Sequence, residues 1–147
     1  TPTETFGYTA RHEDVAHLRT PQELFDGLGL DYADTPHRAP GDPHGPNQGG
    51  TATPEMNYLR YDAVDAEDVF VPRHSELGGD GRFDGQALDP DDPFTGSGYT
   101  SGGVPEFKTD GASSLPPGSE LWRADASGTQ QLIAVLTPGG QWLAVPR

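Results

Sequence analysis

The chain of 147 residues contains no cysteine and only one lysine, Lys108. Without cysteine there can be no disulfide, no thiolate metal ligand and no cysteine nucleophile. The compartment stays open, because a reducing cytosol and a disulfide-free secreted protein both fit. No apolar run is long enough to cross a membrane and no signal-peptide core is visible, so we expect no membrane partner. The chain begins with Thr1 instead of Met, so we expect a fragment or processed form that could have lost a targeting segment.

Positive charge is scarce. The chain has 9 lysine and arginine residues against 23 aspartate and glutamate residues, a formal net charge of -14. Such a surface repels phosphate backbones and releases few counterions, which argues against general DNA or RNA binding. It would instead attract a basic partner, such as a cationic immunity protein or a basic target protein. We expect the protein to be a monomer.

Apolar residues are also few, at 32% of the chain, whereas glycine (20 residues) and proline (15 residues) are abundant. This composition approaches that of disordered proteins. Aromatic residues, at 9%, and compact apolar runs in the second half favour a folded chain. We therefore expect a single domain, residues 1–147, with a modest core and much irregular surface.

The N-terminal part, residues 10–30, carries the helical signals. Its clearest helix follows Thr20, which has the character of an N-cap, with Pro21 at the first helical position and Glu23 as the acid of a capping box. Gly29 is the expected end of this helix. A weaker helical signal precedes it, so the sequence predicts one or two short helices.

The second half is predicted to form a sheet over residues 57–147, after a loop of residues 33–53 that is rich in proline and glycine. Strands are expected at residues 57–62, 68–72, 104–108, 120–124, 131–136 and 141–145. The last three should form a C-terminal meander, with the following core candidates: Leu121, Ile133, Val135 and Leu143. The sequence therefore predicts an α+β fold with a twisted, mainly antiparallel sheet and long Gly/Pro loops.

The segment of residues 93–107 is the most suggestive of chemistry, because dense glycine lets a backbone approach a ligand and its hydroxyls can hydrogen-bond. It runs into a strand with a single acid, Glu106. With Arg60, these residues could cleave the N-glycosidic bond of NAD: arginine would bind the diphosphate and a carboxylate would stabilise positive charge on the ribose. We expect Arg60 and Glu106 to face one cleft, with the loop of residues 96–103 as its wall. The alternative is a plain surface loop and an ordinary strand glutamate.

Four short motifs resemble the toxin tips of actinobacterial polymorphic toxins, and their order is similar to that in the necrotizing-toxin (TNT) type of NAD glycohydrolase, which is related to the ADP-ribosyltransferases. The motifs are Thr35-Pro36-His37-Arg38-Ala39, Tyr58-Leu59-Arg60-Tyr61, the segment from Gly98 to Phe107, and the segment from Leu115 to Arg123. This chain has Glu106 where that family has a functional glutamine. Its first motif is one residue shorter, and its Leu-Pro-Pro-Gly segment stands near the end of the chain instead of near the start.

The resemblance implies a secreted bacterial effector or toxin domain, or one delivered into a target cell, that acts on NAD as glycohydrolase or ADP-ribosyltransferase. NAD would be a substrate, and no prosthetic group is implied. Arg60, Glu106 and Ser101 would be catalytic residues, and Tyr99 and Thr100 would bind NAD together with Arg60. An immunity protein and a protein target are the partners that such an effector implies.

Two other functions stay open. A metal-independent ribonuclease would need two acid/base groups and a cation, which His12 or His17, His74 and Lys108 could supply. A non-catalytic binding, immunity or structural module is the third possibility. We predict no metal site.

The segment Asp80 to Gly85, with Asp91, only faintly resembles a calcium loop. Arg82 occupies a ligand position in it, and no helices flank it. A solvated acidic turn is the favoured interpretation.

Overall fold

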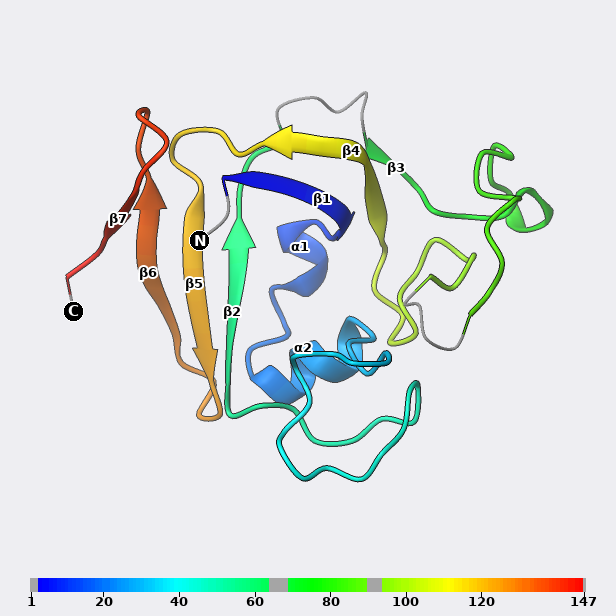
Figure 1. The fold of residues 1–147 in the computed structure, drawn as a ribbon, viewed down its shortest axis with the longest axis horizontal. Coiled ribbons are helices and arrows are strands. Elements are labelled where there is room, and N and C mark those ends of the chain that lie inside the picture. Colours follow the sequence, from blue (N-terminus) through cyan, green and yellow to red (C-terminus); the bar gives the residue numbers. More distant parts are fainter. Residues whose placement is uncertain (1–2, 64–68, 90–93, 147) are drawn as a thin grey trace.

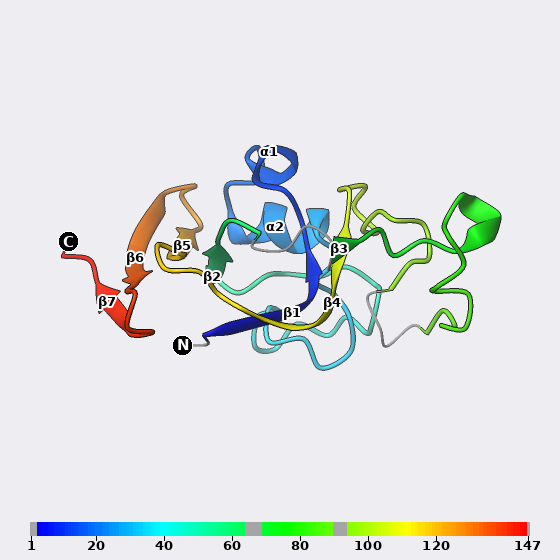
Figure 2. The same cartoon turned by 90° about the horizontal axis from the view of Figure 1, so that it is seen from above.

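The computed structural model describes residues 3–63, 69–89 and 94–146. Two antiparallel sheets lie on either side of a pair of short helices (Figures 1 and 2). The helices are α1 (His12–Val15) and α2 (Pro21–Gly27), and a 3-10 helix, η2, spans Ser75–Leu77. This arrangement confirms the α+β prediction.

The three-stranded sheet has the order β1-β4-β3, formed by β1 (Glu4–Thr9), β4 (Phe107–Ser114) and β3 (Val69–Phe70). The four-stranded sheet has the order β2-β5-β6-β7, formed by β2 (Glu55–Arg60), β5 (Glu120–Asp125), β6 (Gln130–Leu136) and β7 (Trp142–Ala144). Since β2 is an edge strand, its outer side is open toward α1 and the smaller sheet (Figure 1).

Helix α2 forms as its sequence predicts. The Thr20 hydroxyl accepts a hydrogen bond from the Glu23 N–H at 3.1 Å, and Pro21 occupies the first helical position. The helix ends as Gly29 turns the chain with a φ of 65°, in the left-handed region that glycine adopts without strain. Leu24 and Phe25 then face inward and are buried.

The C-terminal meander is confirmed as β5, β6 and β7, and β2 adds to it as a fourth strand. Two features differ from the sequence expectation. Strand β1 was not predicted, and β4 runs from Phe107 to Ser114 instead of over residues 104–108. The partners of β1 lie about a hundred positions further along the chain, so no local pattern reveals the pairing. The predicted strand at 68–72 forms over Val69–Phe70, and Asp68 lies outside the described residues.

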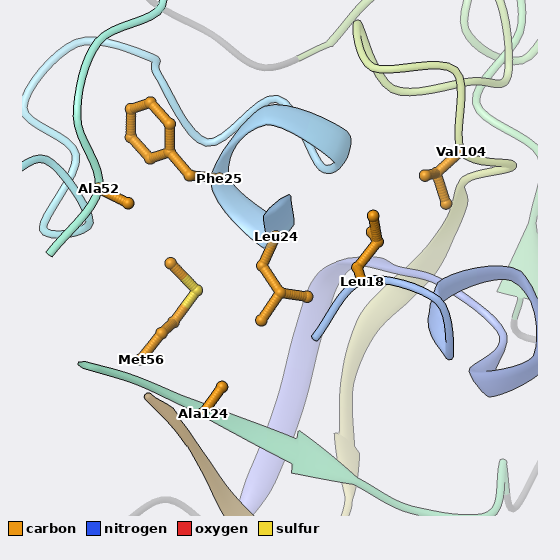
Figure 3. Packing of buried hydrophobic residues seen from close by; sticks show 7 residues of the cluster. All are labelled: Leu18, Leu24, Phe25, Ala52, Met56, Val104 and Ala124. Atoms are coloured by element: carbon orange, nitrogen blue, oxygen red, sulfur yellow. The ribbon is translucent and has the colours of Figure 1, made fainter. Parts of the chain in front are cut away.

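The main core surrounds α2 rather than the meander (Figure 3). It consists of apolar side chains from α2, the loops and the first two strands of the larger sheet: Leu18, Leu24, Phe25, Ala52, Met56, Val104 and Ala124. The predicted core candidates are wrong in this respect. Leu143 is 66% exposed on the edge strand β7, and Leu121, Ile133 and Val135 are only half-buried. A register shift between β5 and β6 opposite Ile133 contributes to this.

The loop of residues 33–53 is closed by the guanidinium of Arg38. Arg38 forms an ion pair with Asp42 at 3.4 Å, and its side chain is only 14% exposed. Its N–H groups also donate at 2.6 to 3.2 Å to three backbone carbonyl oxygens, those of Asp31, Gly45 and Gly49. The loop is therefore organised around one buried cation.

Candidate functional site

A cavity of about 1320 Å³ opens between the two sheets, beside the free edge of β2. Residues of β1, α1, β2 and β4 line it. Ligand cavities commonly measure about 300–1,000 Å³, so this one has room for a ligand larger than a mononucleotide. The charge and the hydrogen bonds of its walls decide which ligand fits.

Arg60, at the end of β2, lines this cavity. It lies directly opposite Glu120 on β5, yet its guanidinium forms no ion pair or hydrogen bond with any residue that the structure describes. It stands over the ring of Trp122 instead, 5.8 Å from the ring centroid, while the indole N–H of Trp122 donates to Glu120 Oε1 at 3.3 Å. The N–H donors of Arg60 thus remain available to a bound anion.

Tyr58 lines the same cavity two residues before Arg60, so both side chains project from one face of β2. Its hydroxyl donates to Gln130 Oε1 at 3.0 Å, and the Gln130 amide in turn donates to the carbonyl oxygens of Leu18 and Arg19 at 3.3 and 3.4 Å. Burial raises the pKa of Tyr58, with Arg60 and Arg19 acting in the opposite direction. The ring is therefore neutral at physiological pH and held in one position.

The cavity wall formed by α1 also carries an arginine, but this one is paired with acidic residues. Arg11 also lines the cavity, but its guanidinium is bonded to Asp14 at 2.8 Å and lies 3.5 Å from Glu13. The hydrogen bond that Arg11 donates to Asp14 raises the pKa of Arg11, and the guanidinium lies over the Phe107 ring, 5.5 Å from its centroid. Its charge is already compensated by the protein. Among the described residues, the carboxylates that line the cavity are those of Glu13 and Asp62.

Glu106 is not among the lining residues, although its neighbour Phe107 is. Side chains alternate in extended backbone, so Glu106 points away from the side on which Phe107 contacts the cavity. It is 4% exposed, and its backbone N–H donates to the Gly98 carbonyl at 2.9 Å. The sequence led us to expect Glu106 and Arg60 in one cleft. The structure does not bring them together in this cavity.

The glycine-rich loop lies outside the cavity as well and is attached to α2. The Thr100 hydroxyl donates to the Gly27 carbonyl at 2.5 Å and accepts from the Val104 N–H at 3.1 Å, so this buried threonine connects the loop to the end of the helix. Tyr99 is 44% exposed and lies under the guanidinium of Arg73. Ser101 is exposed as well. None of Tyr99, Thr100 and Ser101 lines the cavity.

The residues proposed for a ribonuclease are dispersed. His12 lines the cavity and His17 is exposed, whereas His74 contacts the Gln86 carbonyl at 2.9 Å and the ring of Phe94. Lys108 lies between two aromatic rings, those of Tyr8 and Phe83. Within the part of the chain that the structure describes, no contact joins the histidines to one another or to Lys108.

The acidic segment shows local pairing. Asp80 is bonded to Arg82 at 3.0 Å, and Asp84 accepts hydrogen bonds from the N–H and hydroxyl of Ser75. These hydrogen bonds lower the pKa of Asp84. Asp91 lies outside the described residues. Among residues 3–63, 69–89 and 94–146, no group of His, Asp and Glu could hold a metal ion, and no helix is long and apolar enough to span a bilayer.

Sequence reasoning selected Arg60 but not the residues that position its neighbours. Gln130 and Phe107 carry no local signal, since their contacts with Tyr58 and Arg11 cross between distant segments. The alternation of Tyr58 and Arg60 on one strand was a usable signal, because it places a ring and a cation side by side. A scan against protein-family models and searches of curated proteins and of solved structures found nothing that matches this chain.

Proposed function

We propose that this protein is a secreted bacterial effector domain that acts on NAD, by hydrolysis or ADP-ribosyl transfer, and that the dinucleotide binds in the cavity between the sheets. One observation carries the proposal. In a chain with a net charge of -14, Arg60 lines the cavity without an ion pair to any described residue. An arginine left in that state can bind a diphosphate with two parallel hydrogen bonds.

The reaction breaks the bond between the nicotinamide nitrogen and C1′ of its ribose. The bonding electrons go to the nicotinamide ring and neutralise it, and positive charge develops on the sugar. Water, or a nucleophile of a target protein, adds to C1′ and loses its proton. A carboxylate beside the ribose would lower the barrier. Among the described carboxylates, Glu13 and Asp62 line the cavity and could take that position, whereas Glu106 does not line it.

The test is to incubate the purified protein with NAD and to quantify nicotinamide and ADP-ribose by liquid chromatography. Arg60→Gln should lower the rate on the order of a hundredfold, the effect of a lost charge-assisted contact in a catalytic site. Arg123→Gln is the matched control, because Arg123 lies on the neighbouring strand β5, outside the cavity lining, and pairs with Glu55 at 3.8 Å. It should keep its activity.

Inducible expression in a bacterium separates this proposal from its rivals. Loss of NAD with intact RNA supports it, whereas RNA degradation without loss of NAD would point to the ribonuclease. If growth, NAD and RNA all stay unchanged and the purified protein binds no NAD, the proposal is wrong and a binding module remains.

A further inference from the structure

Tyr58 is half-buried, and a chain of hydrogen bonds fixes the position of its ring. Its hydroxyl is bonded to Gln130, which is itself anchored on the carbonyls of Leu18 and Arg19. The side chain packs against the core cluster around α2 and also lines the cavity. A ring fixed in this way loses little conformational entropy when a flat ligand stacks on it.

The distance between the ring and the cation fits a nucleotide. Residues two apart on a strand are separated by about 6.6 Å, and both Tyr58 and Arg60 project from the same face of β2. In a nucleoside phosphate, one ribose separates the base from the phosphate, which is a span of similar length. A base stacked on Tyr58 would therefore place its phosphates near Arg60.

The surrounding charge discriminates between the two bases of NAD. Arg60 lies two residues along β2 from Tyr58 and on the same face, so a fixed positive charge stands beside the ring. The nicotinamide ring of oxidised NAD is itself a cation, whereas adenine is neutral. A positive potential disfavours the first and leaves the second unaffected.

We infer that Tyr58 and Arg60 form a subsite for adenosine diphosphate, in which adenine stacks on the Tyr58 ring and the diphosphate binds the Arg60 guanidinium. The inference rests on the proposed function in assigning the cavity to NAD, and it deepens it by naming the half of the substrate that is recognised. Ligands that contain adenosine diphosphate, such as ADP and ADP-ribose, should then bind without any nicotinamide.

Calorimetric titration tests the subsite directly. ADP and ADP-ribose should bind within a few-fold of NAD, and nicotinamide mononucleotide should bind at least about tenfold more weakly. Tyr58→Ala should weaken ADP binding on the order of tenfold or more, the usual effect of losing one stacked base, while Tyr58→Phe should retain it. Tyr32→Ala is the matched control, because Tyr32 is half-buried like Tyr58 but does not line the cavity.

Saturation-transfer NMR on the unaltered protein gives a second readout that does not depend on the folding of a variant. Irradiation of protein aromatic protons should saturate the adenine protons of NAD more than its nicotinamide protons. The inference is overturned if nicotinamide protons dominate, or if a folded Tyr58→Ala binds ADP as the unaltered protein does. Consumption of NAD alongside either result would leave the proposed function standing. ADP binding that depends on Tyr58, without any turnover of NAD, would support the subsite and contradict the proposed function.

Discussion

The loop around Arg38 and the cavity wall around Arg60 are two regions with one arginine each, and both arginines belong to motifs that suggested NAD chemistry. Arg38 is 14% exposed, bonded to three carbonyl oxygens and paired with Asp42. Arg60 has no such bond to any described residue and lines an open cavity. An arginine whose terminal N–H groups are bonded within the protein stabilises the fold, whereas one whose donors are unused is available to a ligand.

The first prediction concerns stability in the Arg38 region and has the largest expected effect. Arg38→Ala leaves three carbonyl oxygens without their shared donor and removes the ion-pair partner of the Asp42 carboxylate, which is 3% exposed and keeps its hydrogen bonds from His44 and Thr51. Loss of one member of a buried ion pair costs about 3–5 kcal/mol. Urea unfolding should show a loss of this size. Arg38→Lys should recover only part of it, because an ammonium cannot reach all of these acceptors at once. If Arg38→Ala lowered the free energy of unfolding by less than about 1 kcal/mol, Arg38 would not be the structural residue that distinguishes its loop from the Arg60 region.

The second prediction compares a leucine of the core around α2 with one on the far edge of the larger sheet. Leu24, on α2, is 6% exposed, and Leu24→Ala should cost about 2–5 kcal/mol. Leu143, on the sheet that carries Arg60, is 66% exposed, and Leu143→Ala should change stability by at most about 0.5 kcal/mol. Thermal melts of both variants check this. A larger loss of stability for Leu143→Ala than for Leu24→Ala would mean that the meander, and not α2, holds the core.

The parts of the fold that the sequence predicted are those with local signals. Thr20, Pro21 and Glu23 act within one turn of helix, so their effect is visible in the sequence itself. The meander is similar, since β5, β6 and β7 are joined by short turns. The core could not be predicted in this way. Leu143 is as apolar as Leu24, and only the position of α2 against one face of the sheet decides which of them is buried.

The same limit applies to the candidate site. Arg60, an arginine among aromatic neighbours on a strand, was expected to bind phosphate in a cleft; it lines the cavity, and its role toward a ligand stays a prediction. Glu106 was placed there because it follows a glycine-rich loop, offers a carboxylate for the ribose and stands where the resembling family has a glutamine. In the structure, that loop is attached to the end of α2 by the hydrogen bond from Thr100 to the Gly27 carbonyl. Whether such a loop binds a ligand or a helix depends on which segment the chain brings next to it, and the sequence does not encode that locally.

The third prediction uses pH to probe the Arg38 region. The N–H and imidazole of His44 and the N–H of Thr51 hydrogen-bond to Asp42 and hold the pKa of its carboxyl far below its ordinary value of about 3.9. A depressed pKa stabilises the fold at pH values above about 4, and this stability is lost as the pH falls further, because the unfolded chain takes up the proton first. The substitution Asp42→Asn replaces this carboxyl by an amide, which does not titrate.

The melting temperature of Asp42→Asn should therefore lie below that of the unaltered protein at pH 6, and the difference should shrink as the pH is lowered from 5 toward 2, a window of about three units around the ordinary carboxyl pKa. Asp62→Asn, in the Arg60 region, controls for the loss of one negative charge. A difference that stays constant over this range would show that the Asp42 carboxylate does not hold the loop.

The last prediction has the smallest expected effect, and it concerns the stability of the Arg60 region. Arg60→Gln removes the contact with the Trp122 ring, which at an exposed site is worth about 0.5–1 kcal/mol, and breaks no ion pair among the described residues. Its main-chain pairing with Glu120 does not depend on the side chain. Urea unfolding followed by tryptophan fluorescence should show a change of at most about 1 kcal/mol and an unchanged m value. If Arg60→Gln instead destabilised the fold as much as Arg38→Ala, Arg60 would be a structural residue, and any loss of NAD binding in that variant would reflect unfolding. A stable Arg60→Gln variant makes its loss of activity interpretable, because the substitution then acts on the ligand and leaves the fold intact.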